Sequence, residues 1–177
     1  MRKWEGLEGL ESALSELCHQ IKIKDKLTWQ AHDNESVMVQ EFIEHDFEIR
    51  VYVVDGKIEG MIHTKFEKYD GEFTGFKLCN TSEEAADKWM DGDYAAIQSA
   101  SEQCRTLTDH WMVWVQVQSC EMPAAIRFDY MVKRSGPGTA NVWTLEICEL
   151  GFSCIRQQSL PEKVFASMVK SCLQEVI

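Results

Sequence analysis

Two pairs of residues near the end of the chain have types and spacing suited to metal chemistry. Arg127 and Asp129 are two apart in one strand-forming run, and Glu146 and Cys148 are two apart in a later one. Because side chains alternate between the faces of a strand, each pair shares one face, and hairpin neighbours bring both pairs onto one surface. Two carboxylates there suit Mg²⁺, which prefers oxygen ligands and keeps water or phosphate oxygens in its other positions. The alternative is a solvent-facing Arg/Asp ion pair without a ligand.

A second charged cluster lies earlier in the chain. Glu48 and Arg50 share a strand face, which sets an acceptor for hydroxyl groups beside a clamp for anions. The preceding run Gln40-Glu41-Phe42-Ile43 offers backbone amide groups to a purine edge. The alternative is the solvated face of an edge strand.

The elements that must position these residues follow from periodicity and turn signals. Apolar residues at spacings of three and four predict an amphipathic helix over Leu7–Ile21. Runs rich in β-branched and aromatic residues predict strands over Val37–Ile43, Phe47–Val54 and Lys57–Ile62, the last two joined at Asp55-Gly56, a strong hairpin signal.

The second half of the chain alternates between helical and strand patterns. After a loop over His63–Lys77 with a short strand near Phe73–Cys79, the N-cap signal at Thr81 predicts a helix that breaks near Asp91. The later elements are a helix over Tyr94–Leu107, strands over Trp111–Cys120, Ala124–Lys133 and Val142–Cys148, and a terminal helix opened by Ser159-Leu-Pro161.

This order is neither strict βαβ alternation nor all-β. It predicts an α+β fold, an antiparallel sheet with helices packed on one side. We find no internal repeat and no linker, so residues 1–177 are expected to form a single domain without an internal boundary.

Composition narrows the function classes. The 177 residues are 45% hydrophobic and 27% charged, which is typical of a folded globular chain. The net charge of −11 opposes non-specific binding to nucleic acid or to anionic membranes. Seven cysteines without paired CxxC spacing, and no stretch of signal-peptide or membrane-span type, predict a reducing, cytoplasmic location.

Taken together, the clusters resemble the ATP-grasp superfamily, with the likeness running from about residue 7 to residue 154. The run Val37–Ile43 resembles the segment that contacts adenine in its ligases, and Glu48-Ile-Arg50 resembles the acid-x-arginine element that follows. Arg127-Phe-Asp129-Tyr130, with Leu145–Gly151 after a turn, is similar to the R-x-D-[FY] … E-x-N-x-x-P-G signature of D-alanine:D-alanine ligase and its relatives.

The resemblance implies ATP and Mg²⁺ as cofactors, a small carboxylate as substrate, and ligation of an amine or thiol through an acyl phosphate. It implies that Asp129 and Glu146 hold Mg²⁺, that Arg127 stabilises the developing charge, and that Glu48 binds the ribose hydroxyls. The other implied ATP-binding residues are Gln40, Glu41, Phe42 and Ile43 at the adenine, and Arg50 and Lys65, with His63 beside them, at phosphates or an acidic substrate.

Three departures bear on this expectation. Cys148 stands where the family has a metal-binding asparagine, Leu150 replaces the signature proline, and no glycine-rich phosphate loop precedes Leu7–Ile21. The resemblance therefore implies the rear portion of an ATP-grasp fold, in which a second copy or a partner chain covers the face left by the front portion. The alternative function is a non-catalytic remnant that serves as a binding or interaction module.

Overall fold

The computed structural model describes residues 9, 11, 12, 14–16, 41, 43–69, 72–119, 122–149, 152–154 and 157–174. The chain divides into two compact units, Met1–Ile43 and Glu44–Ile177. In the first unit, the described residues of the predicted helix Leu7–Ile21 are helical. Of the predicted strand Val37–Ile43, only Glu41 and Ile43 are described, and neither is in a strand.

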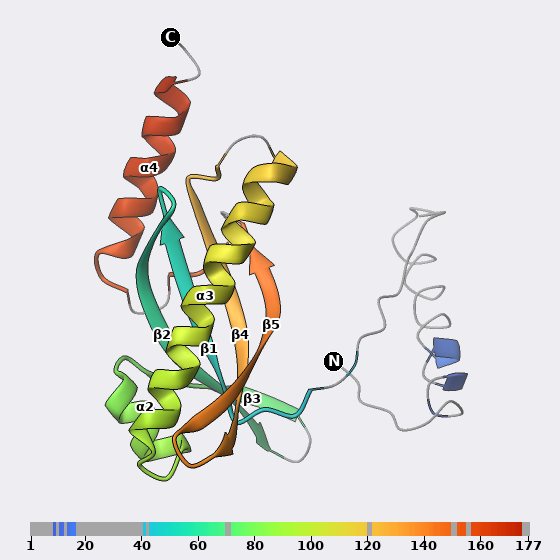
Figure 1. Cartoon of the computed structure of the whole chain (residues 1–177). Helices are drawn as coiled ribbons and strands as arrows, with labels where there is room; N and C mark the ends of the chain where they lie inside the picture. Colours follow the sequence, from blue (N-terminus) through green and yellow to red (C-terminus); the bar gives the residue numbers. More distant parts are fainter. Residues whose placement is uncertain are drawn as a thin grey trace. The chain divides into compact units, whose positions relative to one another are not determined.

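The second unit is built on one five-stranded sheet in which all neighbouring strands are antiparallel (Figure 1). Its order is β3-β2-β1-β4-β5. The strands are β1 (Phe47–Val54), β2 (Lys57–Tyr69), β3 (Glu72–Cys79), β4 (Ala125–Gly136) and β5 (Thr139–Cys148). This confirms the predicted α+β class with an antiparallel sheet.

The turn between β1 and β2 is the one that the sequence predicts. Asp55 and Gly56 both have positive φ, 48° and 73°, as a tight two-residue hairpin requires. The predicted loop over His63–Lys77 is wrong, because β2 continues to Tyr69 and pairs with β3. Charged residues interrupt the alternation of apolar and polar residues in this edge hairpin, so the sequence pattern does not predict its strands.

Three helices accompany the sheet. Helix α2 (Ser82–Trp89) begins where predicted, and the Thr81 side chain accepts a hydrogen bond from the backbone N–H of Glu84. Helix α3 (Tyr94–Ser119) continues through the predicted strand Trp111–Cys120, which is therefore wrong. Apolar residues on both sides of this part of α3 obscure its helical period. Helix α4 (Leu160–Gln174) is the predicted terminal helix.

The main core fills the space between one face of the sheet and helices α2 and α3. Alternate residues of β1 and β4 supply the sheet side of this core, and α3 supplies Ile97, Ala100 and Cys104. A smaller cluster on the opposite face joins Tyr52 and Ile62 to Leu160 at the start of α4. Two helices thus cover one face, as predicted, and α4 packs at one end of the other face.

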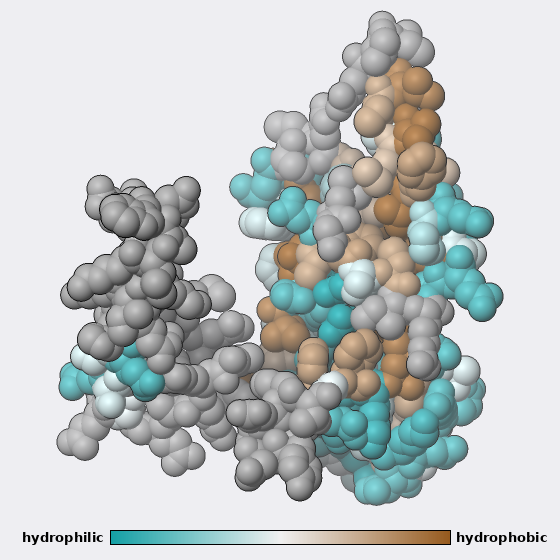
Figure 2. Space-filling view, turned by 180° about the vertical axis from the view of Figure 1, so that it is seen from behind, coloured by the Kyte–Doolittle hydropathy of each residue, from teal (hydrophilic) through white to brown (hydrophobic). Residues whose placement is uncertain are grey.

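Figure 2 shows that opposite face, with a column of hydrophobic side chains along α4. No helix in the described part of the chain is long and apolar enough to cross a membrane.

Candidate functional site

The sheet face opposite α2 and α3 carries a cluster of charged residues from β1, β4 and β5. Strand β1 is buried along its whole length, and its alternation turns Glu48 and Arg50 away from the apolar core. In the β4 pairing, Arg50 lies opposite Asp129, and in the β5 pairing Glu146 lies opposite Asp129. The antiparallel register therefore lines up charged side chains across three adjacent strands.

Arg127 is the centre of this cluster. Its guanidinium donates two hydrogen bonds to Asp129, at 2.7 Å from Nε and 2.8 Å from Nη2, which is the bidentate arrangement. The same Nη2 lies 3.2 Å from Oε1 of Glu146 and 3.2 Å from Sγ of Cys148. One buried cation thus orients the two carboxylates and the thiol.

A second arginine extends the cluster towards β2. Nε of Arg50 lies 3.8 Å from Oδ2 of Asp129 and donates a hydrogen bond of 3.2 Å to the Thr64 hydroxyl. Its Nη2 lies 3.4 Å from Oε2 of Glu48, and the ring of Phe66 lies beneath its guanidinium. Two arginines and three carboxylates therefore form one connected network with a formal charge of −1.

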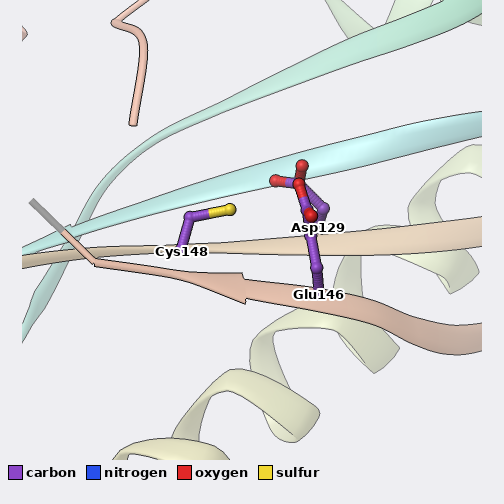
Figure 3. A group of neighbouring side chains, drawn as sticks. All are labelled: Asp129, Glu146 and Cys148. Atoms are coloured by element: carbon purple, nitrogen blue, oxygen red, sulfur yellow. The ribbon is translucent and has the colours of Figure 1, made fainter. Parts of the chain in front are cut away.

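Three potential metal ligands meet at the β4–β5 edge of this network (Figure 3). The ligand atoms of Asp129, Glu146 and Cys148 all lie within 4.8 Å of one another. The Asp129 side chain is only 1% exposed, whereas that of Glu146 is 53% exposed. A cation from solvent therefore reaches Glu146 first and Asp129 behind it.

The acidity of these groups follows from burial and from their neighbours. Burial raises the pKa of Asp129 to about 6, against the lowering by Arg127 and Arg50. Burial also acts to raise the pKa of Glu146, but hydrogen bonds with Cys148 and Asp129, together with the positive charges of Arg127 and Arg50, outweigh it, and the net direction is downward. Burial raises the pKa of Cys148 to about 11, so its thiol is protonated at neutral pH.

The donor set fits Mg²⁺ through its oxygens alone. Mg²⁺ in proteins is commonly held by one or two carboxylates, with water or phosphate oxygens in the remaining positions. Asp129 and Glu146 meet that requirement. Cys148 does not, because sulfur is a soft ligand and this thiol keeps its proton.

The structure does not bring Lys65 or His63 into this cluster. The β2–β3 register places both on the helix-covered face, because His63 pairs with Cys79 of the main core and Lys65 follows two residues later. His63 is 3% exposed, and neither of its ring nitrogens has a hydrogen-bond partner among the described residues.

The predicted adenine contacts lie outside the second unit. Gln40 and Phe42 are not among the described residues, and Glu41 and Ile43 belong to the first unit. Their role at the adenine stays a prediction.

Two residues that contact the network, Thr64 and Tyr52, were not predicted from the sequence. Thr64 accepts from Arg50 and lies 3.5 Å from Glu48, and Tyr52 lies beside Arg127 with its hydroxyl donating to the carbonyl of Ser153. The alternation of β1 is a signal that could have found Tyr52, because it places Tyr52 on the face of Glu48 and Arg50. Thr64 gave no such signal, because its face depends on an irregularity in β2.

Comparison with known proteins gives one structural match. No protein-family model and no curated protein matches the sequence. A crystal structure of D-alanine–D-alanine ligase from Bacillus anthracis matches with 15% identity and a TM-score of 0.39, over 76% of this chain and 42% of that one. The chain thus spans less than half the length of the ligase it matches.

Proposed function

We propose that the charged cluster binds the triphosphate of ATP together with Mg²⁺, as in an ATP-grasp ligase. The observation that carries this proposal is the convergence of Asp129 and Glu146, with ligand atoms within 4.8 Å of each other, under a shared arginine. The sequence motifs around both residues resemble that superfamily, and the pairing of β4 with β5 is the arrangement that the motifs require.

This proposal assigns a role to each charged side chain of the cluster. Asp129 and Glu146 hold the cation, which when bound neutralises phosphate charge and orients the phosphates. Arg127 holds both carboxylates in place and stabilises negative charge that develops beside them. Arg50 supplies the cationic contact to phosphate, and Glu48 accepts the ribose hydroxyls after exchanging its present contacts with Arg50 and Thr64.

The proposed reaction is ligation of a small carboxylate with an amine or thiol through an acyl phosphate. The second candidate, a non-catalytic nucleotide-binding or interaction module, is favoured by Cys148. Its neutral thiol contributes no ligand to Mg²⁺ where the family provides an amide oxygen, so the cation would have one protein ligand fewer.

Isothermal titration with ATP, with and without Mg²⁺, tests the binding step. We expect ATP to bind only in the presence of Mg²⁺, and Glu146→Gln to weaken that binding at least tenfold. Glu146 is half exposed, so the isosteric variant should fold, which far-UV circular dichroism checks. Glu67→Gln removes an exposed carboxylate that pairs with Lys77 elsewhere on the sheet, and it serves as the matched control.

The results separate the alternatives. Undetectable binding at millimolar ATP with Mg²⁺, or equal affinity in wild type and Glu146→Gln, refutes the proposed site. Mg²⁺-dependent binding without ADP production in the presence of a panel of small carboxylates and amines favours the non-catalytic module.

A further inference from the structure

The thiol of Cys148 lies among the ligands of the proposed cation site, and the proposed function gives it no role. Its Sγ and one oxygen each of Asp129 and Glu146 lie within 4.8 Å of one another. In Figure 3 the sulfur points towards the two carboxyl groups. Cys148 is partly exposed and the Glu146 side chain is half exposed, so solvent reaches two of the three groups. A cation can therefore enter from solvent and keep water in a remaining position.

The hydrogen bonds of Arg127 hold these ligand atoms without using all their electron pairs. Nη2 of Arg127 carries two N–H groups, but three acceptors surround it. These are Oδ2 of Asp129 at 2.8 Å, Oε1 of Glu146 at 3.2 Å and Sγ of Cys148 at 3.2 Å. Each oxygen of Asp129 accepts from Arg127 through one lone pair and retains a second. Metal-binding carboxylates are commonly held in place by hydrogen bonds of this kind.

Charge balance distinguishes the cations that this set can hold. The two arginines and three carboxylates of the network have a formal charge of −1 while the Cys148 thiol is protonated. Mg²⁺ leaves the thiol protonated and brings the network to +1, which phosphate must then offset. A cation that binds sulfur displaces the thiol proton, so a divalent cation of that kind brings the network to zero without nucleotide. An uncompensated charge in a buried network is costly, which favours the second cation.

We propose that Asp129, Glu146 and Cys148 form a Zn²⁺ site that fills in the absence of nucleotide. Zn²⁺ accepts thiolate and carboxylate ligands, and its open sites combine three protein ligands with one water. Mg²⁺ has little affinity for sulfur. On binding, the S–H bond of Cys148 breaks, its proton passes to water, and a Zn–S bond replaces one Zn–water bond. The inference rests on the proposed function in taking Asp129 and Glu146 as cation ligands, and it names the cation that they bind together with the thiol.

The site needs only a small movement to reach the geometry of a zinc centre. With Zn–S of about 2.3 Å and Zn–O of about 2.1 Å, tetrahedral ligands lie about 3.5 Å apart. The three atoms now lie within 4.8 Å of one another, so they must approach by about 1 Å. Rotation of the half-exposed Glu146 side chain supplies that movement, while Arg127 holds the buried Asp129 in place.

Cobalt substitution of the full chain, with its thiols reduced, tests this site, because Co²⁺ accepts the same tetrahedral ligands as Zn²⁺ and absorbs light. We expect Co²⁺ added without nucleotide to bind one-to-one and to give a thiolate-to-cobalt charge-transfer band in the near ultraviolet, with the intense visible bands of four-coordinate Co²⁺. Equimolar Zn²⁺ should abolish these bands, whereas about a hundredfold excess of Mg²⁺ should leave them unchanged.

Substitutions assign the bands to individual ligands. Cys148→Ser should abolish the charge-transfer band, and Glu146→Gln should weaken Co²⁺ binding at least tenfold. Cys172→Ser is the matched control, because Cys172 is an exposed cysteine on α4 and the substitution is the same. Far-UV circular dichroism and urea midpoints check that each variant folds.

Several outcomes overturn the zinc site. They are a wild type without the charge-transfer band, a band that persists in Cys148→Ser or is lost equally in Cys172→Ser, equal Co²⁺ affinity in Glu146→Gln and wild type, and displacement by Mg²⁺ but not by Zn²⁺. The ATP titration contains neither Co²⁺ nor Zn²⁺, so the two proposals fail separately. ATP binding with Mg²⁺ but no cobalt band overturns the zinc site and leaves the proposed function standing, and a Cys148-dependent band in a chain that binds no ATP does the reverse.

Discussion

Replacing Arg127 with methionine should show how much this arginine contributes to the free energy of unfolding through the buried charged network. The change leaves Asp129 buried and without its bidentate partner, and Glu146 and Cys148 lose the donor that links them. Breaking a buried ion pair by removing one partner costs about 3 to 5 kcal/mol. Arg50 remains 3.8 Å from Asp129 and compensates in part, so we expect a loss of about 3 kcal/mol in the free energy of unfolding at pH 8.

The loss should depend on pH, with a sign fixed by Asp129. Its folded-state pKa of about 6 lies above the ordinary value of 3.8, so the folded protein retains this proton at pH values where the unfolded chain has released it. Without Arg127 that pKa rises further. The deficit of Arg127→Met therefore grows as pH increases through 6, and at pH 5.5, where Asp129 is largely protonated in both proteins, only about 1 kcal/mol of lost hydrogen bonding remains.

Urea denaturation of wild type and variant at both pH values provides the assay. Arg134→Met is the matched control, because Arg134 is one-third exposed and pairs with Asp91 and Asp93 near the surface. Exposed pairs contribute about 0 to 1 kcal/mol, so this control should lose at most that amount at either pH. A deficit for Arg127→Met that is flat with pH, or no larger than that of Arg134→Met, refutes the buried-network reasoning.

Three further predictions concern the scaffold. Burial lowers the pKa of His63 in the folded protein below its ordinary value of 6.5. The stability that neutral His63 contributes is therefore complete above pH 6.5 and is lost as pH falls through the lowered folded-state pKa. In His63→Leu, the free energy of unfolding measured with urea should fall less steeply at acid pH. Thr81→Ala removes the N-cap acceptor of Glu84 and should cost about 1 kcal/mol in urea unfolding. Gly56→Ala places a side chain at φ 73°, where no atom lies within 4 Å of the new Cβ, so urea unfolding should show a loss of about 1 kcal/mol from backbone strain alone.

Each of these has an outcome that contradicts it. An acid profile equally steep in His63→Leu and wild type means that another group titrates. Thr106→Ala, which removes an exposed hydroxyl inside α3, is the control for Thr81→Ala, and equal losses in the two variants contradict a capping role. An unchanged urea midpoint in Gly56→Ala contradicts the strain argument.

Local signals sufficed for several elements. The Asp55-Gly56 turn and the Thr81 cap act over a few residues, and the structure has both where the sequence places them. The last third of α3 could not be predicted in this way, because its outer face is as apolar as its inner face. Val113, Trp114 and Val117 on the outer side of the helix remove the one-sided apolar pattern by which a surface helix is recognised. The run of Val and Trp then favours a strand.

The candidate site depends on two irregularities that no local pattern predicts. A regular hairpin from Asp55-Gly56 would set His63 opposite Glu48, and Lys65 would share that face. Instead Tyr52 pairs with Gly60 and Val53 with Ile58, so the extra residue in β2 turns His63 and Lys65 to the helix side.

The second irregularity places the candidate metal ligands. Tyr130 pairs with Thr144 but Asp129 pairs with Glu146, so one extra residue, Leu145, changes the register of β5. Without it, Leu145 would oppose Asp129, and Glu146 would point into the apolar core beneath α3. The spacing of Glu146 and Cys148 shows only that they share a face. The bulge makes this the face of Arg127 and Asp129, so the sequence specifies the charges of the site, and the strand irregularities decide which of them meet.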